Sequence, residues 1–455
     1  MTRQKKNLSM SVALIALLAS TSAYAEPAAD GDVFKDALAS TYQNNPRIKA
    51  ERQRLEATDE GVAQAVSGFR PSAGITYDRG RQRTDFAGAG NVYSDVDSKG
   101  LRIEQPLFRG FGTISSFRAA KQRVRAGQAD LQAVEQAVML QAITAYMDVV
   151  ASQSILELSR NNKDVLDKQL QASKDRFDVG EVTRTDVAQS EARLSQARTD
   201  VIEAEGQLIS SIAAFERTIG FKPEGALNVP DHAPELPVSL QEALDKAQAA
   251  NPQLLAALRN YKASDYDITT NISTILPRVS LLATMTDQEG AGALGNSTFK
   301  QDAVTVNFQI PLYQSGAEYS RVREAKAIAR QQKHNAMETE LSVEEAVTRA
   351  WEDLETSIAT ITEREDQIKA AEIALDGVKQ EQEYGARTVL DVLDAEQELF
   401  SSRTNLVRAQ RDRVVATYNL LVTLGELTPE ALELGVASYD PNEHYNDVKW
   451  QPIGF

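Results

Sequence analysis

The chain repeats one sequence pattern at a distance of about 205 residues, and this duplication restricts the folds open to it. At an offset of 206, Ala37-Leu38, Asn45-Pro46 and Pro71 recur as Ala243-Leu244, Asn251-Pro252 and Pro277. At an offset of 205, the recurring positions include Pro106-Leu107-Phe108 with Pro311-Leu312-Tyr313, Gly180 with Gly385, and Asp186 with Asp391. Matches that stay in register over such a length indicate a tandem duplication. Each half is predicted to contain helix, strand, loop, strand, a very long helix, a turn and a helix.

Four parts are expected along the chain: a secretory signal at 1–25, a first repeat at 26–225, a second repeat at 226–435 and a C-terminal tail at 436–455. The signal has a positively charged start, an apolar stretch from Met10 to Ala19 and the small-residue cleavage motif Ala23-Tyr24-Ala25. We therefore expect the mature protein outside the cytoplasm. No later stretch offers the roughly 20 apolar residues that a membrane-spanning helix needs.

Two proline-free stretches predict very long helices, at about 113–179 and about 317–384. At 1.5 Å per residue, each would be roughly 100 Å long. The first stretch has Phe117, Val124, Leu131, Val138, Ala145 and Ser152 at seven-residue spacing, and the second has a matching series from Val322 to Ser357. Such heptads favour coiled coils. Because much of this seam is Ala or Ser, helices packed on neighbours to both sides, as in the wall of a tube, suit it best.

Each half also has two segments with alternating apolar and polar residues. The predicted strands are at about 71–80, 97–107, 277–287 and 301–311, joined by polar loops at 79–96 and 287–300. Alternation of this length is typical of outer-membrane barrel strands, which have one face to lipid and one to water. Four strands are too few to close a barrel, so several chains must contribute.

The sequence offers little material for catalysis or for a bound cofactor. It has no Cys, and its three His (His232, His334 and His444) show no ligand spacing. The Gly290–Gly295 segment fits a dinucleotide-binding fingerprint, but a strand follows it where a helix is required, so we interpret it as a loop. The net charge of −16 argues against nucleic-acid binding. We expect no enzyme activity, no metal and no cofactor.

The turns after the two long helices are the most specific motifs. They run from Phe177 through Val179, Gly180, Thr185 and Asp186, and from Tyr384 through Gly385-Ala386-Arg387-Thr388 to Asp391-Val392-Leu393-Asp394. With the duplication and the Pro-Leu-Phe segment, they make the chain resemble the TolC family of outer-membrane efflux and secretion ducts. The resemblance covers nearly the whole mature chain. It implies a homotrimer with a twelve-stranded barrel in outer-membrane lipid above a twelve-helix periplasmic tube.

The resemblance also implies roles for residues at the periplasmic tip of that tube. Asp391 and Asp394 would form carboxylate rings around the constriction, and Arg387 would link to Thr185 and Asp186 on the neighbouring coil. The turns at Val179, Gly180, Gly385 and Ala386 would contact a periplasmic adaptor. Since Asp391 and Asp394 are three residues apart, they share a helix face, and rings of carboxylates favour cations. From the residues alone, a solvated acidic stripe on an ordinary coil is the alternative.

One departure from the family pattern affects the tip. Better-known members have a Tyr three residues before the turn glycine, which bonds across to an Asp. Here that position is Gln382, and Tyr384 comes directly before Gly385. Whether Gln382, Tyr384 or neither makes the link is left open.

The expected function is a passive exit duct for drug efflux or type I protein secretion, gated at its periplasmic tip. An adaptor and an inner-membrane RND pump or ABC exporter would supply energy and specificity. The alternative is a soluble periplasmic coiled-coil adaptor or scaffold, which explains the export signal and the heptads but leaves the four alternating strands unexplained. A secreted filament or adhesin is a further alternative, and it would assemble without closing.

Overall fold

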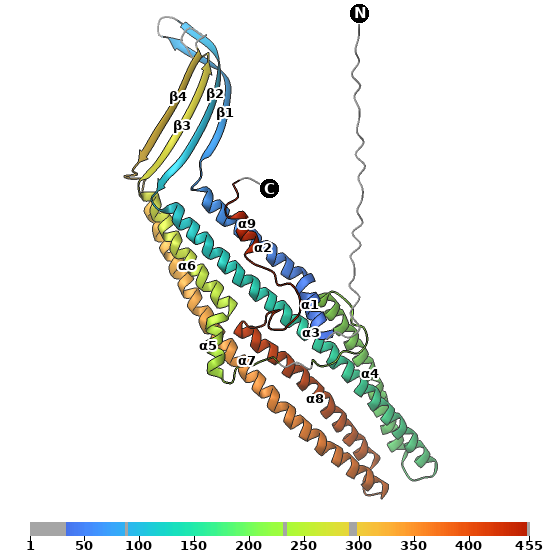
Figure 1. The fold of residues 1–455 in the computed structure, drawn as a ribbon. Coiled ribbons are helices and arrows are strands. Elements are labelled where there is room, and N and C mark those ends of the chain that lie inside the picture. Colours follow the sequence, from blue (N-terminus) through green and yellow to red (C-terminus); the bar gives the residue numbers. More distant parts are fainter. Residues whose placement is uncertain (1–32, 87–89, 231–233, 291–297, 453–455) are drawn as a thin grey trace, which may run out of the picture.

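The computed structural model describes residues 33–86, 90–230, 234–290 and 298–452. It has a β-sheet at one end and two helical hairpins at the other (Figure 1). The secretory signal, His232 and most of the Gly290–Gly295 segment lie outside these ranges. The predicted fold class, long antiparallel coiled coils with four strands per chain, is confirmed.

Two 67-residue helices, α3 (Gly112–Asp178) and α7 (Ala317–Glu383), run the length of the helical part. Each turns back into a 36-residue helix, α4 (Arg184–Ile219) or α8 (Val389–Leu424), so that α3–α4 and α7–α8 form the two hairpins. The heptad positions from Val124 to Ser152 are buried, as are their counterparts from Ala329 to Ala350. The predicted seam is therefore the packed face of each long helix.

Shorter helices complete two columns beside the long ones (Figure 1). They are α1 (Val33–Asn44), α2 (Pro46–Ser67), α5 (Leu240–Ala250), α6 (Pro252–Ile272) and the 3-10 turn η1 (Ser273–Ile275). Asn45 caps α2 and also donates to the carbonyl of Thr218 at the end of α4, at 3.0 Å. Asn251 caps α6 and donates to the carbonyl of Thr423 in α8, at 2.9 Å. The duplicated Asn-Pro pairs thus join the short helices end to end with the returning helices.

The main core lies midway along the helical part, where helices from both repeats meet. Its buried apolar residues come from each of the helices α1 to α8 and include Phe34, Leu38, Ile143, Phe215, Val347 and Leu420. Aromatic rings pack closely here: the centroids of Phe34 and Tyr146 are 5.1 Å apart. The two repeats therefore share one core and do not fold as separate halves.

The sheet contains β1 (Ser72–Phe86), β2 (Gly90–Arg109), β3 (Arg278–Glu289) and β4 (Thr298–Gln309), paired antiparallel in that order. The registers place Ile103, Ala283 and Val304 side by side, so one face of the sheet is apolar. On the same face Val304 and Val306 are exposed in the single chain. The outer edges of β1 and β4 have no neighbouring strand among the described residues.

The loop expected at 79–96 is wrong for most of its length, because β1 and β2 continue through it. Arg79 faces Asp97 and Arg81 faces Asp95 across the strands, with ion pairs of 3.3 and 2.9 Å. Opposite charges placed directly across a sheet stabilise strand pairing. The polar, Gly-rich composition of this segment predicts a loop, whereas the paired charges extend the hairpin.

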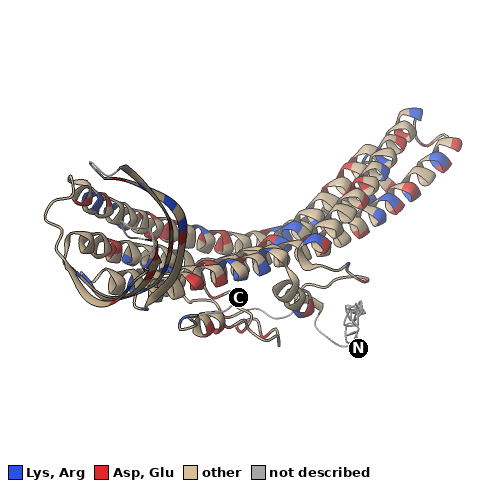
Figure 2. Cartoon of the chain, turned by 90° about the horizontal axis from the view of Figure 1, so that it is seen from above, with Lys and Arg blue, Asp and Glu red and all other residues tan. Residues whose placement is uncertain are grey.

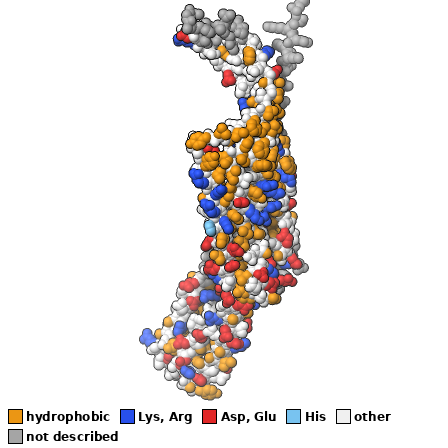
Figure 3. Space-filling view, turned by 90° about the vertical axis from the view of Figure 1, so that its left-hand side faces the viewer, with side chains coloured by type: hydrophobic (Ala, Val, Ile, Leu, Met, Phe, Trp, Pro, Cys, Tyr) orange, Lys and Arg blue, Asp and Glu red, His pale blue; other side chains and the backbone are white. Residues whose placement is uncertain are grey.

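No helix in the described ranges is both long enough and apolar enough to cross a bilayer. Hydrophobic side chains nevertheless gather on the helical surface next to the sheet, whereas toward the hairpin tips they are mixed with acidic and basic side chains (Figure 3).

The hairpin tips as a candidate gate

Both hairpins turn at a glycine in the left-handed backbone region. Gly180 has a φ of +84° and Gly385 a φ of +76°. The next residue closes each turn: the N–H of Glu181 donates to the backbone carbonyl of Arg176 at 2.9 Å, and that of Ala386 donates to the backbone carbonyl of Glu381 at 2.8 Å. Residues with a Cβ rarely adopt this conformation, so glycine is required at both turns.

Each returning helix begins with a capping box, and the duplication supplies both. In the second box the carboxylate of Asp391 accepts from the backbone N–H and the hydroxyl of Thr388, both at 2.8 Å. The N–H of Asp391 donates to the Thr388 hydroxyl at 3.3 Å. Thr183 and Asp186 make the same contacts in the first box. Each box satisfies N–H groups that would lack a partner at a helix start.

The capping hydrogen bonds also fix the charge state of Asp391. The bonds from the backbone and side chain of Thr388 lower the pKa of this carboxyl below its usual value. Asp391 is therefore ionised at neutral pH, at the positive end of the α8 dipole. The hydrogen bonds that hold this carboxylate come from the first turn of α8 itself.

Arg387 pairs within its own hairpin in the single chain. Its Nε lies 2.8 Å from Glu381, and Nη1 lies 4.0 Å from Asp391. The hydrogen bond to Glu381 raises the pKa of the guanidinium. The link from Arg387 to Thr185 and Asp186 stays a prediction that concerns the assembled protein.

Asp394 has a partner on the other hairpin. Its Oδ1 lies 2.5 Å from Nη2 of Arg193 on α4. Arg193 could not be recognised from the duplication. The residue 205 positions later is Glu398, so the basic side chain is not repeated. The packing of the two hairpins brings together residues that are 201 positions apart.

An apolar cluster lies beside this ion pair and holds the hairpins together. Leu194 and Leu393, the neighbours of Arg193 and Asp394 in sequence, are both buried in it. The other buried members are Leu166, Leu170, Ala197 and Val389. The hairpin tips are thus joined by apolar packing with one polar contact at its margin.

Neither Gln382 nor Tyr384, the two residues that could replace the tyrosine of the family pattern, links the hairpins in the single chain. Tyr384 is 89% exposed. Gln382 is half-buried, and its amide nitrogen is buried without a hydrogen-bond partner among the described residues.

The two turns lie at the far end of the molecule from the sheet (Figure 1). Val179 is 72% exposed, and Gly180, Gly385 and Ala386 are also exposed. Acidic and basic residues are interspersed along the hairpins up to these turns (Figure 2). The turns therefore present a small apolar and polar surface that is free in the single chain.

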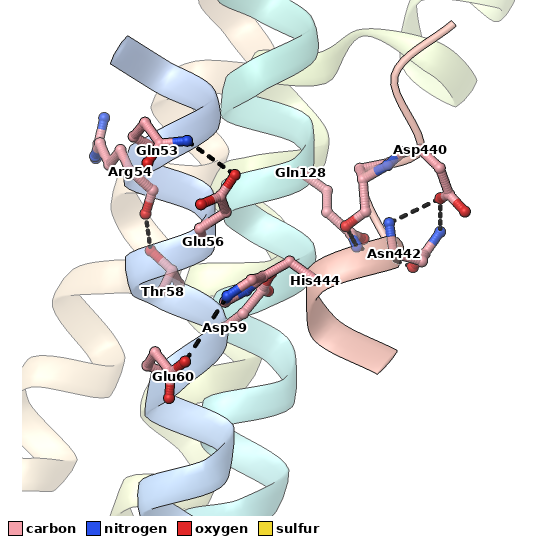
Figure 4. Close-up of polar contacts among 11 residues, drawn as sticks. Gln53, Arg54, Glu56, Thr58, Asp59, Glu60, Gln128, Asp440, Asn442 and His444 are labelled. Atoms are coloured by element: carbon pink, nitrogen blue, oxygen red, sulfur yellow. Dashed lines mark hydrogen bonds and ion pairs between the residues drawn. The ribbon is translucent and has the colours of Figure 1, made fainter. Parts of the chain in front are cut away.

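A second polar cluster fastens the C-terminal tail to α2 and α3 (Figure 4). Nδ1 of His444, in α9 (Glu443–Val448), lies 3.4 Å from Asp59 of α2. Gln128 of α3 donates to the side-chain oxygen of Asn442 at 3.0 Å. Burial raises the pKa of Asp59 to about 6, although His444 acts to lower it. No sequence pattern predicts a role for this tail.

Two further contacts hold the tail at its ends. The guanidinium of Arg52 stacks between the rings of Tyr42 and Tyr439, 4.7 Å from each centroid. Arg70, just before β1, donates to the carbonyls of Trp450 and Gln451 at 2.7 and 3.0 Å. The tail thus runs along α2 toward the sheet. The described residues contain no group of three or more His, Asp or Glu placed to hold a metal ion.

The model for outer membrane efflux proteins matches residues 37–220 and 243–426, which coincide with the two repeats. The chain is 33% identical over 434 residues to the outer membrane efflux protein BepC of Brucella suis, covering 95% of this chain and 94% of that one. It is 25% identical over 414 residues to the alkaline protease secretion protein AprF of Pseudomonas aeruginosa, covering 88% and 86%. A crystal structure of CusC superposes with a TM-score of 0.78 at 16% identity, covering 86% of this chain and 91% of that one.

Proposed function

The chain belongs to the outer membrane efflux protein family, and we propose that it forms a passive exit duct with a gate at its hairpin tips. It is an outer-membrane channel protein that extends into the periplasm. Its family is one of passive channels, so the role of this chain is conduction and the chemistry of transport belongs to its partners.

The observation that carries the proposal is the open four-stranded sheet. Its apolar face is exposed, and within the described ranges neither of its outer edges pairs with another strand. Three chains supply twelve strands, which suffice to close a barrel with the apolar face toward lipid. The same threefold arrangement brings the α3–α4 and α7–α8 hairpins together into a tube below it.

The exposed sheet also counts against a soluble adaptor or scaffold. Ile75, Val304 and Val306 are exposed on strands that no helix covers among the described residues. A soluble protein would leave this surface in water at a cost of about 25 cal/mol for each Å². In a barrel the same surface contacts lipid chains.

In the assembled duct the tips are the narrow end. Arg387 bonds to Thr185 and Asp186 of a neighbouring coil and keeps the hairpins turned inward. An adaptor that binds Val179, Gly180, Gly385 and Ala386 favours a second arrangement in which the hairpins separate. Each solvated ion pair is worth at most about 1 kcal/mol, so threefold repetition is needed to hold the tip closed.

The exported cargo is set by the inner-membrane partner, an RND pump or an ABC exporter. BepC is an efflux protein and AprF is a protease secretion protein, so we propose drug efflux or type I secretion for this chain. Identifying the pump that co-purifies with the protein distinguishes the two.

The test uses the mature protein, extracted from membranes with detergent. The proposal expects a trimer by light scattering and discrete single-channel currents in planar bilayers. A monomer that stays soluble without detergent and gives no current would reject the duct and support the scaffold.

A further inference from the structure

We infer that Arg193 sets the charge of the constriction: it neutralises Asp394 while the hairpins are together and releases it when they separate. This inference rests on the proposed duct function, and it adds a residue that determines the affinity of the constriction for cations. It makes the tip a charge switch as well as a mechanical gate.

The first observation is that the ion pair between Arg193 and Asp394 connects the two hairpins. Near the tip, most described pairs between helices stay inside one hairpin, such as Lys174 with Glu191 and Arg403 with Glu372. The pair between Arg193 and Asp394 joins α4 of the first hairpin to α8 of the second. Separating the hairpins therefore breaks this pair and leaves the pairs within each hairpin intact.

The second observation is that the two aspartates differ in what holds them. Asp391 is held by Thr388 of its own capping box, and this contact moves with α8. Asp394 is held by a residue of the other hairpin, at 2.5 Å. The polar contacts of Asp391, including Arg387 at 4.0 Å, thus stay within its own hairpin, whereas Asp394 is neutralised only while the two hairpins are together.

The third observation is that the pair has no counterpart in the duplicated sequence. The positions that match Arg193 and Asp394 in the other repeat are Glu398 and Gln189. The capping boxes, by contrast, occur in both repeats. The pair is therefore a feature of the contact between the two repeats, whereas the boxes belong to the duplicated helix start.

The apolar cluster makes release of Asp394 depend on hairpin movement. Leu194 and Leu393 are 3% and 1% exposed, and they adjoin the paired residues. The side chains of Arg193 and Asp394 are 36% and 57% exposed, so water can replace the pair once this packing opens. With threefold symmetry, Arg193 neutralises three of the six constriction carboxylates at rest and none when the hairpins are apart, since among the described residues Asp391 contacts only Thr388 and Arg387 of its own hairpin. A ring of six carboxylates binds multivalent cations more tightly than a ring of three.

The test measures block of single-channel current by trivalent lanthanum in planar bilayers, with the full-length mature protein. Arg193→Gln frees Asp394 without moving it, and we expect block at a roughly tenfold lower concentration than in the wild type. Arg193→Lys keeps the charge and should restore the wild-type value. Arg403→Gln is the matched control: its pair with Glu372 is 2.7 Å long and similarly exposed but lies inside one hairpin.

A double-mutant cycle separates this role from a general loosening of the tip. In an Asp394→Asn background, Arg193→Gln should leave the blocking concentration unchanged. The inference is overturned if Arg193→Gln leaves block unaltered in the wild-type background, or if it has an equal effect without Asp394. A wild-type protein that passes no current would overturn the duct itself, whereas current with unaltered block overturns only the role of Arg193.

Discussion

The imidazole of His444 lies 3.4 Å from the carboxylate of Asp59, which ties the C-terminal tail to the first repeat. Nε2 of the same ring lies 3.8 Å from Glu60, and Asp59 itself is 1% exposed. The tail is therefore a packed part of the fold and gives the first two predictions.

Removing the imidazole should loosen the tail. His444→Ala leaves Asp59 buried without this partner, so we expect faster protease cleavage between residues 436 and 452 and unaltered cleavage of the hairpins. Limited proteolysis with mass spectrometry measures both. His334→Ala, at an exposed position on α7, serves as the control. Equal cleavage of the His444→Ala variant and the wild type would contradict a fastening role.

The buried carboxyl of Asp59 should make tail stability depend on pH. Its pKa is raised from 3.8 to about 6, so the folded state binds this proton more readily than the unfolded state between those values. The free energy of unfolding should therefore be about 1–2 kcal/mol higher at pH 5 than at pH 7.5, because this contribution is lost as pH rises through about 6. Hydrogen exchange of residues 443–448 at pH 5 and pH 7.5 measures it. Asp59→Asn should abolish the difference at this site, and a difference that persists in this variant would assign it to another group.

Breaking the proposed gate link should open the duct. Arg387→Ala combined with Asp186→Ala removes both charges, and we expect single-channel conductance to rise severalfold. Because Asp186 also caps α4, Thr183→Ala is the control: it weakens the same capping box and keeps both charges. If conductance stays at the wild-type value, or rises equally with Thr183→Ala, the link lies elsewhere.

Neutralising both aspartates should weaken cation binding at the constriction. Asp391→Asn with Asp394→Asn keeps an acceptor in the capping box while removing two charges per chain. We expect block by trivalent cations to need at least tenfold more cation. Asp376→Asn, at an exposed position on α7, is the control. Block that survives in the double variant would locate the cation site away from these residues.

The asparagines that join the short helices to the returning helices should matter for stability. Asn251→Ala removes a cap for α6 and the 2.9 Å bond to Thr423, and Asn251 is buried. We expect a loss of about 1–2 kcal/mol, measured by denaturant unfolding of the helical signal. Asn335→Ala, at an exposed position inside α7, should cost little. Equal unfolding midpoints for the two variants would argue against this joint.

The periodic features of the chain could be predicted from its sequence. The long helices follow from proline-free heptads, and the turns follow from Gly180 and Gly385, because these local patterns determine local structure. The extension of β1 and β2 was missed because a polar, Gly-rich segment predicts a loop until the partners of Arg79 and Arg81 across the strand are known. Cross-strand pairing is a property of two segments, and one segment alone does not reveal it.

The candidate site was predictable only where it is local. The capping boxes can be recognised from Thr388 and Asp391, which are three residues apart. Arg193 could not be recognised, since its contact with Asp394 depends on how two hairpins pack. The role of the tail was missed for the same reason: His444 meets a carboxylate 385 positions earlier in the chain.

The unpaired edges of β1 and β4 have a consequence for biogenesis. A strand edge with free N–H and C=O groups pairs readily with any other edge it meets, and lipid offers no hydrogen bonds to satisfy it. A single copy of this chain is therefore unfavourable in both environments. In water its strand edges favour aggregation, and in the bilayer the N–H and C=O groups of these edges lack hydrogen-bond partners. In the proposed trimer, barrel closure and subunit association therefore satisfy these strand edges in a single event.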